Sequence, residues 1–188
     1  MAARDLVTAT DAARAEDVSV VLVEQPYRVA GRRSPAPAHQ LDAAWIAVVH
    51  HLRAAELGDV PIVVGGRSSG ARVACRTVAE TGAIGVLCLA FPLRPPRRAQ
   101  GGVQQSRIGE LDEVTVPVLV VQGARDPFGI PPPSATRTVV EVAGNHSLRT
   151  DLGAIATAVR EWLPRVLRGE SEAPLARSAG GRRPRARR

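Results

Sequence analysis

The sequence predicts an α/β fold in which a mostly parallel sheet carries helices on both faces. Its 188 residues suit one domain with a single core. Short apolar segments rich in β-branched residues alternate with segments of helical periodicity. These segments are apolar throughout rather than at every second residue, which is typical of strands buried in a parallel sheet. Together the observations predict strands and helices that alternate along one layered domain.

The first half of the chain contains two predicted strands and two predicted helices. Residues 18–23, with the sequence VSVVLV, predict a buried strand that is followed by a long, turn-rich loop. Residues 40–57 repeat apolar side chains at helical spacing, and Gly58 lies just past their end, where a helix stop is expected. Residues 61–64 predict the next strand and residues 69–80 the next helix.

The second half predicts three further strands, over residues 84–90, 116–121 and 136–142. The stretch between the first two holds several prolines and glycines, so we expect a loop or lid-like insertion with a short helix over 106–114. The last helix starts near Thr150 and carries its apolar residues on one face. Pro164 is expected to disturb its final turn.

The net charge of +7 is concentrated at the C-terminal end of the chain. Residues 169–188 hold six arginines against Glu170 and Glu172, and they predict a disordered tail after a folded domain of residues 1–168. The tail has no aromatic residue that could stack on a base. All basic residues of the chain are arginines, which indicates codon bias rather than selection for phosphate binding. The composition therefore argues against nucleic acid as a partner.

The sequence also predicts a cytoplasmic protein without a membrane segment. Its longest apolar stretch, residues 83–91, is far shorter than the roughly 20 residues that span a bilayer. The first twenty residues mix acidic and basic side chains and lack the apolar centre of a secretion signal. Cys75 and Cys88 both fall in segments predicted to be buried, so we expect reduced core thiols.

The strongest local motif is G-x-S-x-G, formed by Gly66, Ser68 and Gly70 between a predicted strand and a predicted helix. A serine nucleophile must project from a tight strand-to-helix turn, where side chains two residues away on either side are expected to collide. The amide of Ser69, at the helix N-terminus, would then face an oxyanion formed on attack by Ser68. The alternatives are a turn that merely caps the helix or a phosphate-binding loop. A Walker loop is excluded because the chain has no lysine.

A serine hydroxyl needs a base to take its proton and an acid to orient that base. Asp126 follows the predicted strand 116–121, and His146 follows the next strand, which is the chain order expected for a nucleophile elbow fold. Asp126 alone is more typical of a turn residue, so the assignment depends on the three residues together. The other histidines lie in a helix or a proline-rich loop, and the sequence shows no metal-ligand cluster and implies no cofactor.

With these residues in place the chain resembles the α/β-hydrolase superfamily, and within it the small dienelactone-hydrolase-like members related to testis-expressed protein 30. The resemblance spans residues 18–163. It is carried by the segments 65–74 (GGRSSGARVA), 91–96 (FPLRPP), 118–129 (VLVVQGARDPFG) and 145–148 (NHSL). It implies Ser68 as nucleophile, Asp126 as the orienting acid, His146 as general base and a small acyl compound as substrate.

The chain departs from this family at its N-terminus. Family members usually begin with two or more strands and a Gly-rich loop that donates a second hydrogen bond to the oxyanion, and nothing like these precedes residue 18. Residues 1–16 resemble the helix that normally follows that loop. We therefore expect either a start codon assigned too late or a shortened product. In either case exposed sheet edges could allow association into oligomers.

Two functional hypotheses follow from these residues. The first is a serine hydrolase that acts on an ester, thioester or similar acyl bond. The second is a catalytically impaired α/β-hydrolase-like protein that serves as a binding module. Arg67 beside the nucleophile, with Arg28, Arg32 and Arg33 in a nearby loop, could favour an acidic substrate, although solvated surface arginines explain them as well.

Overall fold

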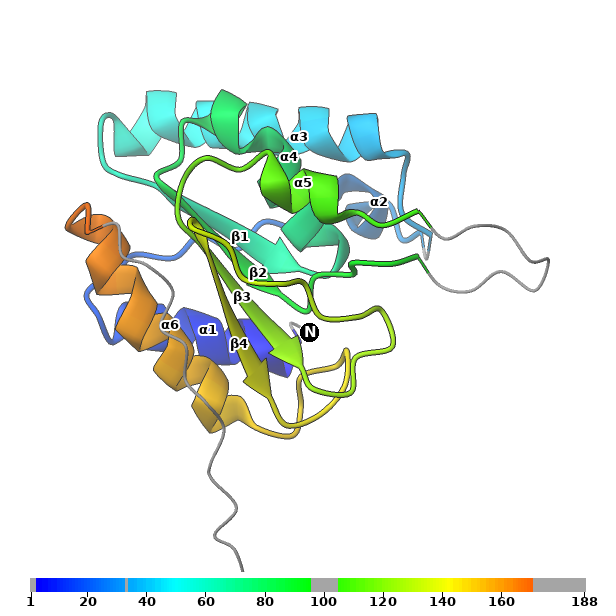
Figure 1. Cartoon of the computed structure of the whole chain (residues 1–188). Coiled ribbons are helices and arrows are strands. Elements are labelled where there is room, and N and C mark those ends of the chain that lie inside the picture. Colours follow the sequence, from blue (N-terminus) through cyan, green and yellow to red (C-terminus); the bar gives the residue numbers. More distant parts are fainter. Residues whose placement is uncertain (1–2, 33, 96–104, 171–188) are drawn as a thin grey trace, which may run out of the picture.

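The structure is a computed structural model, and it describes residues 3–32, 34–95 and 105–170. Four parallel strands form one sheet in the order β1-β2-β3-β4. They are β1 (Val63–Arg67), β2 (Gly85–Leu89), β3 (Val118–Gly123) and β4 (Arg137–Val142). Figure 1 shows the sheet as the middle layer of the molecule. The predicted α/β fold with a parallel sheet is confirmed.

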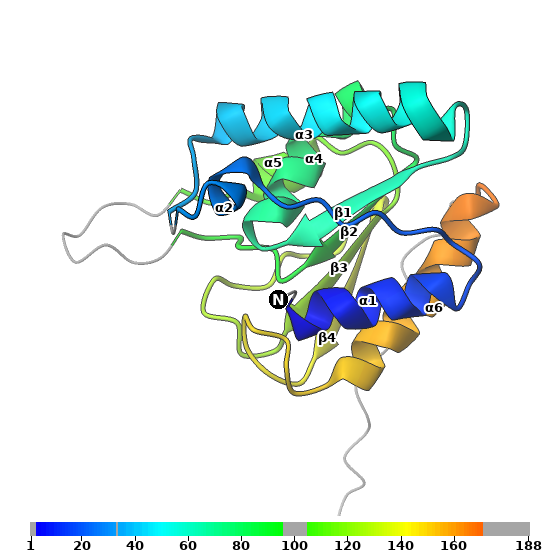
Figure 2. The same cartoon turned by 180° about the vertical axis from the view of Figure 1, so that it is seen from behind.

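Helices cover both faces of the sheet (Figures 1 and 2). On one face lie α1 (Arg4–Arg14) and α6 (Leu152–Leu167), which pack against each other. On the other face lie α4 (Ser69–Thr81) and the short α5 (Ile108–Asp112), and α3 (Ala38–Leu52) packs on α4. A single turn, α2 (Pro26–Val29), precedes α3, and a turn of π-helix, η1 (Arg53–Leu57), follows it.

Strand β3 lies in the middle of the core, and its side chains pack alternately on the two faces of the sheet. Val118 and Val120 belong to the apolar cluster under α4 and α5, whereas Leu119 and Val121 belong to the cluster under α1 and α6. All four are fully buried. A strand covered on both sides has no polar face, which is why residues 118–121 of β3 are apolar at every position.

The prediction of a buried strand over residues 18–23 is wrong. This segment is extended but is not part of the sheet, and Val21 and Leu22 are 55% and 56% exposed. A strand is stabilised by hydrogen bonds to a neighbour, and in the described part of the chain the sheet ends at β1, with β2 as its partner. The β-branched composition of the segment therefore does not suffice to make it a strand.

The helices differ from prediction in two smaller respects. The predicted helix 40–57 changes to π-helical bonding at Arg53 and ends at Gly58, whose φ of +52° suits glycine. Helix α6 continues through Pro164 to Leu167, contrary to the expected disturbance. Val166 beyond the proline is buried in the core, and this packing keeps the last turn in place. The helix expected near the N-terminus is confirmed as α1.

Cys75 and Cys88 are free and buried, as predicted. Across residues 3–32, 34–95 and 105–170, no helix has the length and apolar character needed to cross a membrane. The predicted tail lies almost wholly outside the described residues, because residues 171–188 are not described.

Candidate functional site

Ser68 stands at the turn between β1 and α4, where its backbone is in a conformation unusual for a residue with a side chain. Its φ is +54°, and its N–H donates to the carbonyl of Leu89 at the end of β2, 2.9 Å away. A Cβ at Gly66 would lie 2.5 Å from the backbone carbon of Gly70, so this position requires glycine. A Cβ at Gly70 would meet no atom within 4 Å, so the expectation that both glycines prevent a collision is wrong at Gly70.

His146 lies in the loop between β4 and α6, and its ring reaches the serine. Its Nε2 is 2.9 Å from the Ser68 Oγ, although the two residues are 78 positions apart. The loop approaches the end of β3 very closely, since a Cβ at Gly123 would lie 2.5 Å from the Asn145 carbonyl oxygen. The Phe128 ring and the imidazole form a T-shaped pair with a centroid distance of 4.5 Å and an interplanar angle of 68°. These contacts hold the ring against the serine.

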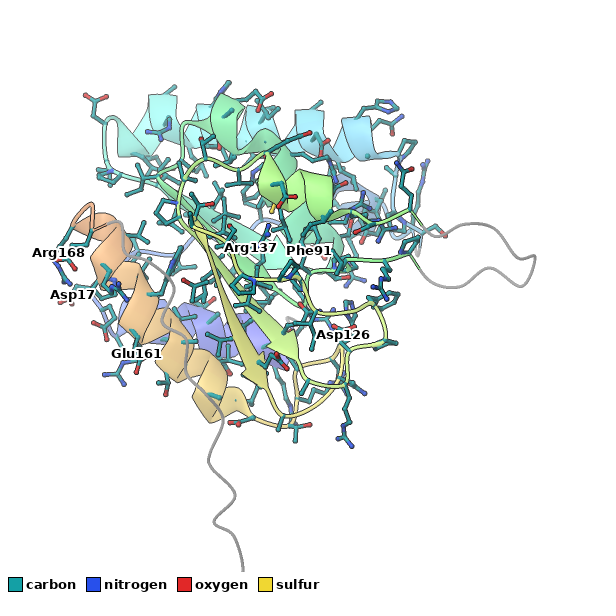
Figure 3. The ribbon with its side chains drawn as sticks, in the orientation of Figure 1. Asp17, Phe91, Asp126, Arg137, Glu161 and Arg168 are labelled. Carbon is teal, nitrogen blue, oxygen red and sulfur yellow. The ribbon has the colours of Figure 1, made fainter. Side chains whose placement is uncertain are left out.

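Asp126 follows β3, as Figure 3 shows, and its carboxylate is completely buried. Its Oδ2 is 2.8 Å from the Nδ1 of His146, and its Oδ1 accepts the N–H of Phe128 at 2.9 Å. A carboxylate only accepts hydrogen bonds, so Nδ1 carries the proton. In the neutral ring, Nε2 is then free to accept the hydroxyl of Ser68. The structure thus brings the three residues of the sequence prediction into one hydrogen-bonded chain.

Gln122, the buried side chain before Gly123 at the end of β3, was not singled out from the sequence. Its Nε2 donates to the Asp126 Oδ2 at 2.8 Å and to the carbonyl of Gly129 at 3.0 Å, and lies 3.1 Å from that of Phe91. Gln122 thereby holds the same carboxylate oxygen that His146 contacts. The sequence signal that could have indicated Gln122 is a polar residue at the end of an otherwise apolar strand.

Arg67 is bonded to α1 and to the loop that bears His146. Its Nε donates to the Asp5 Oδ2 at 2.6 Å, and its Nη2 donates to the His146 carbonyl at 2.8 Å. The Asp5 carboxylate comes from α1 and is fully buried. Of the other arginines considered for an acidic substrate, Arg28 and Arg32 are exposed, and Arg33 lies outside the described residues.

A cavity of about 260 Å³ opens beside Ser68. Its lining comes from the turn before α4, from α4 itself, from the segments after β2 and β3, and from the start of α3 with the residues before it: Ser68, Ser69, Arg72, Pro92, Arg107, Phe128, Pro35, Ala36 and Ala38. Ser69 begins α4, and the first N–H groups of a helix have no acceptor within it. The cavity therefore combines a hydroxyl, a helix N-terminus and two arginines.

Four charged side chains on α3, α4 and α5 are linked beside this cavity. Arg72 forms a bidentate pair with Glu110, and Arg76 bonds both Asp42 and Glu110. The pKa of Arg76 is raised, because these hydrogen bonds and charges outweigh its burial. Among the described residues, no group of His, Cys, Asp and Glu side chains could hold a metal ion.

Comparison with known proteins agrees with this architecture. The structure is similar to that of a serine hydrolase without a lid from Xanthomonas campestris, with 22% identity, a TM-score of 0.64, and 87% of this chain and 76% of that chain covered. It is also similar to an α/β serine hydrolase homologue from Coxiella burnetii, with 16% identity, a TM-score of 0.62, and 86% and 76% covered. At such identities the likeness concerns the fold. No curated protein matches the sequence significantly.

The sequence also matches a family model described as an alpha/beta hydrolase domain. The match spans residues 3–169 and so includes every helix and strand described above. The chain therefore belongs to the α/β-hydrolase domain family.

Proposed function

We propose that this protein is a serine hydrolase that cleaves an ester, thioester or similar acyl bond. The observation that carries the proposal is the hydrogen-bonded chain from Ser68 through His146 to Asp126, with Ser68 facing a cavity. A single α/β fold can support many different chemistries, so the proposal depends on these side chains rather than on the fold.

In the first step the Ser68 Oγ attacks the acyl carbon while its proton passes to the His146 Nε2. Asp126 keeps the ring in the required tautomer and stabilises the imidazolium that forms. The carbonyl oxygen becomes an oxyanion, and the N–H of Ser69 at the start of α4 is the donor proposed to stabilise it. Collapse of the intermediate breaks the bond to the leaving group, which takes the proton from His146, and leaves the acyl group on Ser68.

Water completes the reaction by the same route. His146 takes a proton from water, whose oxygen attacks the acyl carbon. The bond to the Ser68 Oγ then breaks, and the proton returns to that oxygen. The products are a carboxylic acid and the free enzyme.

A fluorophosphonate probe tests the proposal because it reacts with a serine only when a base activates it. We expect the wild-type protein to be labelled, and Ser68→Ala and His146→Ala to lose labelling. Ser147→Ala serves as the matched control, since the hydroxyl of this partly buried serine is bonded to Asn145 rather than to the site, and the variant is expected to leave labelling intact. Folded wild-type protein, verified by circular dichroism, that takes up no probe would support the non-catalytic alternative instead.

A further inference from the structure

Arg107 is held in a fixed position at the cavity that contains Ser68. Its Nη1 donates to the carbonyl of Pro92 at 3.0 Å, and its backbone N–H donates to the carbonyl of Leu93 at 2.8 Å. Both Arg107 and Pro92 line the cavity together with Ser68. One side of the guanidinium is thereby used for positioning, and its other N–H groups remain for a ligand.

The charges around Arg107 do not balance within the described residues. Arg72, Arg76 and Arg107 contribute three positive charges, and Glu110 and Asp42 contribute two negative ones. Both carboxylates are engaged by Arg72 and Arg76. In the described part of the chain, Arg107 forms no ion pair with a carboxylate, and its polar side-chain partner is a neutral carbonyl.

The surroundings also disfavour the charge on Arg107. Its pKa is lowered, first by burial and then by the neighbouring Arg72, and the attraction of Glu110 offsets this only in part. A half-buried guanidinium without a counter-ion gains when an anion enters the cavity. Structural arginines of this chain, such as Arg76 with Asp42, already have such a partner.

We propose that the substrate of this site is an acyl compound that carries a carboxylate, and that Arg107 binds this carboxylate while Ser68 attacks the acyl bond. The inference rests on the proposed function and adds a substrate class to it. A guanidinium offers a planar pair of N–H donors that matches a carboxylate. Arg107 is then a specificity-determining residue.

Two aryl esters of equal length test the inference: 4-nitrophenyl hydrogen glutarate, which has a free carboxylate, and 4-nitrophenyl methyl glutarate, in which that group is esterified. We expect the wild type to favour the anionic ester in kcat/KM by about tenfold or more. Arg107→Gln should abolish this preference, chiefly through KM, and Arg107→Lys should retain part of it. Added salt should reduce the preference, since the interaction is between charges.

Arg94→Gln is the matched control. It removes an arginine from the same segment, but Arg94 is exposed and is not part of the cavity lining. This variant should keep the wild-type preference. Equal cleavage of both esters by the wild type, or an undiminished preference in Arg107→Gln, would overturn the inference while leaving the hydrolase proposal intact.

A binding measurement separates the two proposals if neither ester is cleaved. Isothermal titration of each ester into Ser68→Ala protein reports the anion site without turnover. Binding of the anionic ester at least about tenfold tighter than the neutral one, lost in Ser68→Ala/Arg107→Gln, would support the anion site although the hydrolase proposal had failed. Equal binding of both esters would refute the anion site.

Discussion

Asp5 and Arg67 form a link between α1 and the histidine of the site. A fully buried carboxylate is stable only when it is paired, and Arg67 supplies the charge at 2.6 Å. The same guanidinium donates to the backbone carbonyl of His146. In the proposed mechanism the ring must stay within hydrogen-bond distance of Ser68, so a residue that fixes the histidine backbone would act on the chemistry without touching the substrate. We therefore regard Arg67 and Asp5 as positioning residues.

Loss of this link should lower turnover rather than substrate binding. Arg67→Gln and Asp5→Asn are expected to reduce kcat by about tenfold, since small displacements of a catalytic group are costly. KM should change by less than about twofold, because other residues line the cavity. Steady-state kinetics with a neutral aryl ester measure both quantities.

Arg160→Gln is the control for a general effect on α1. Arg160 on α6 pairs with Glu16 just beyond α1, so its loss breaks another ion pair of the same region. This variant should leave kcat unchanged. Equal losses of kcat in Arg160→Gln and Arg67→Gln would show that the link is structural only.

At the scale of elements, the end of β3 and the loop that bears His146 lie in direct contact. Gly123 permits this because any side chain there would collide with the Asn145 carbonyl. Gly123→Ala should push the loop away and lower kcat/KM by at least about tenfold. Gly109→Ala in α5 is the control, since its Cβ would meet nothing within 4 Å and alanine favours a helix. Kinetics unchanged in Gly123→Ala would contradict this account of the loop.

The elements that could be predicted from the sequence are those in which the order of apolar and polar residues follows which faces are buried. Strand β2 and residues 118–121 of β3 are apolar throughout because they are covered on both faces, and α6 is amphipathic because it is covered on one. Residues 18–23 have the same composition as a buried strand, yet they lie outside the sheet. Composition reports the tendency to be a strand, but pairing with a neighbour decides the outcome.

The residues of the candidate site likewise fall into those that the sequence could predict and those that only the tertiary fold reveals. The contact among Ser68, His146 and Asp126 could be predicted because each lies in a short motif directly after a strand, whereas their catalytic role stays a prediction. Asp5 is 62 residues from its partner Arg67, so only the tertiary fold reveals their contact. Arg107 is likewise one arginine among many in the sequence, and its missing counter-ion becomes visible only when Arg72 and Arg76 are seen to occupy the nearby carboxylates.

On the scale of the whole molecule, the described residues form two apolar clusters that share one sheet. Trp162 belongs to the cluster under α1 and α6, and Cys75 and Cys88 belong to the cluster under α4. Strand β3 contributes alternate side chains to both clusters, so neither face can lose its packing without disturbing the other. This arrangement predicts cooperative unfolding of the domain.

The two clusters carry natural probes that test this cooperativity. Cys88 is fully buried and lies 3.5 Å from the Cys75 sulfur, and its pKa is raised by this hydrogen bond and by burial. The reactive thiolate is therefore suppressed in the folded protein. In urea, the extent of labelling by short pulses of iodoacetamide should follow global unfolding.

The fluorescence of Trp162 reports the opposite face once Trp45, the other tryptophan of the chain, is replaced in Trp45→Phe. In this variant the fluorescence and thiol transitions should share one urea midpoint. Separate midpoints, with the thiols exposed before the Trp162 signal changes, would show that the α4 face opens independently. In that case β3 would couple the two clusters less strongly than the packing indicates. It would also hold Asp126, which follows it, less firmly.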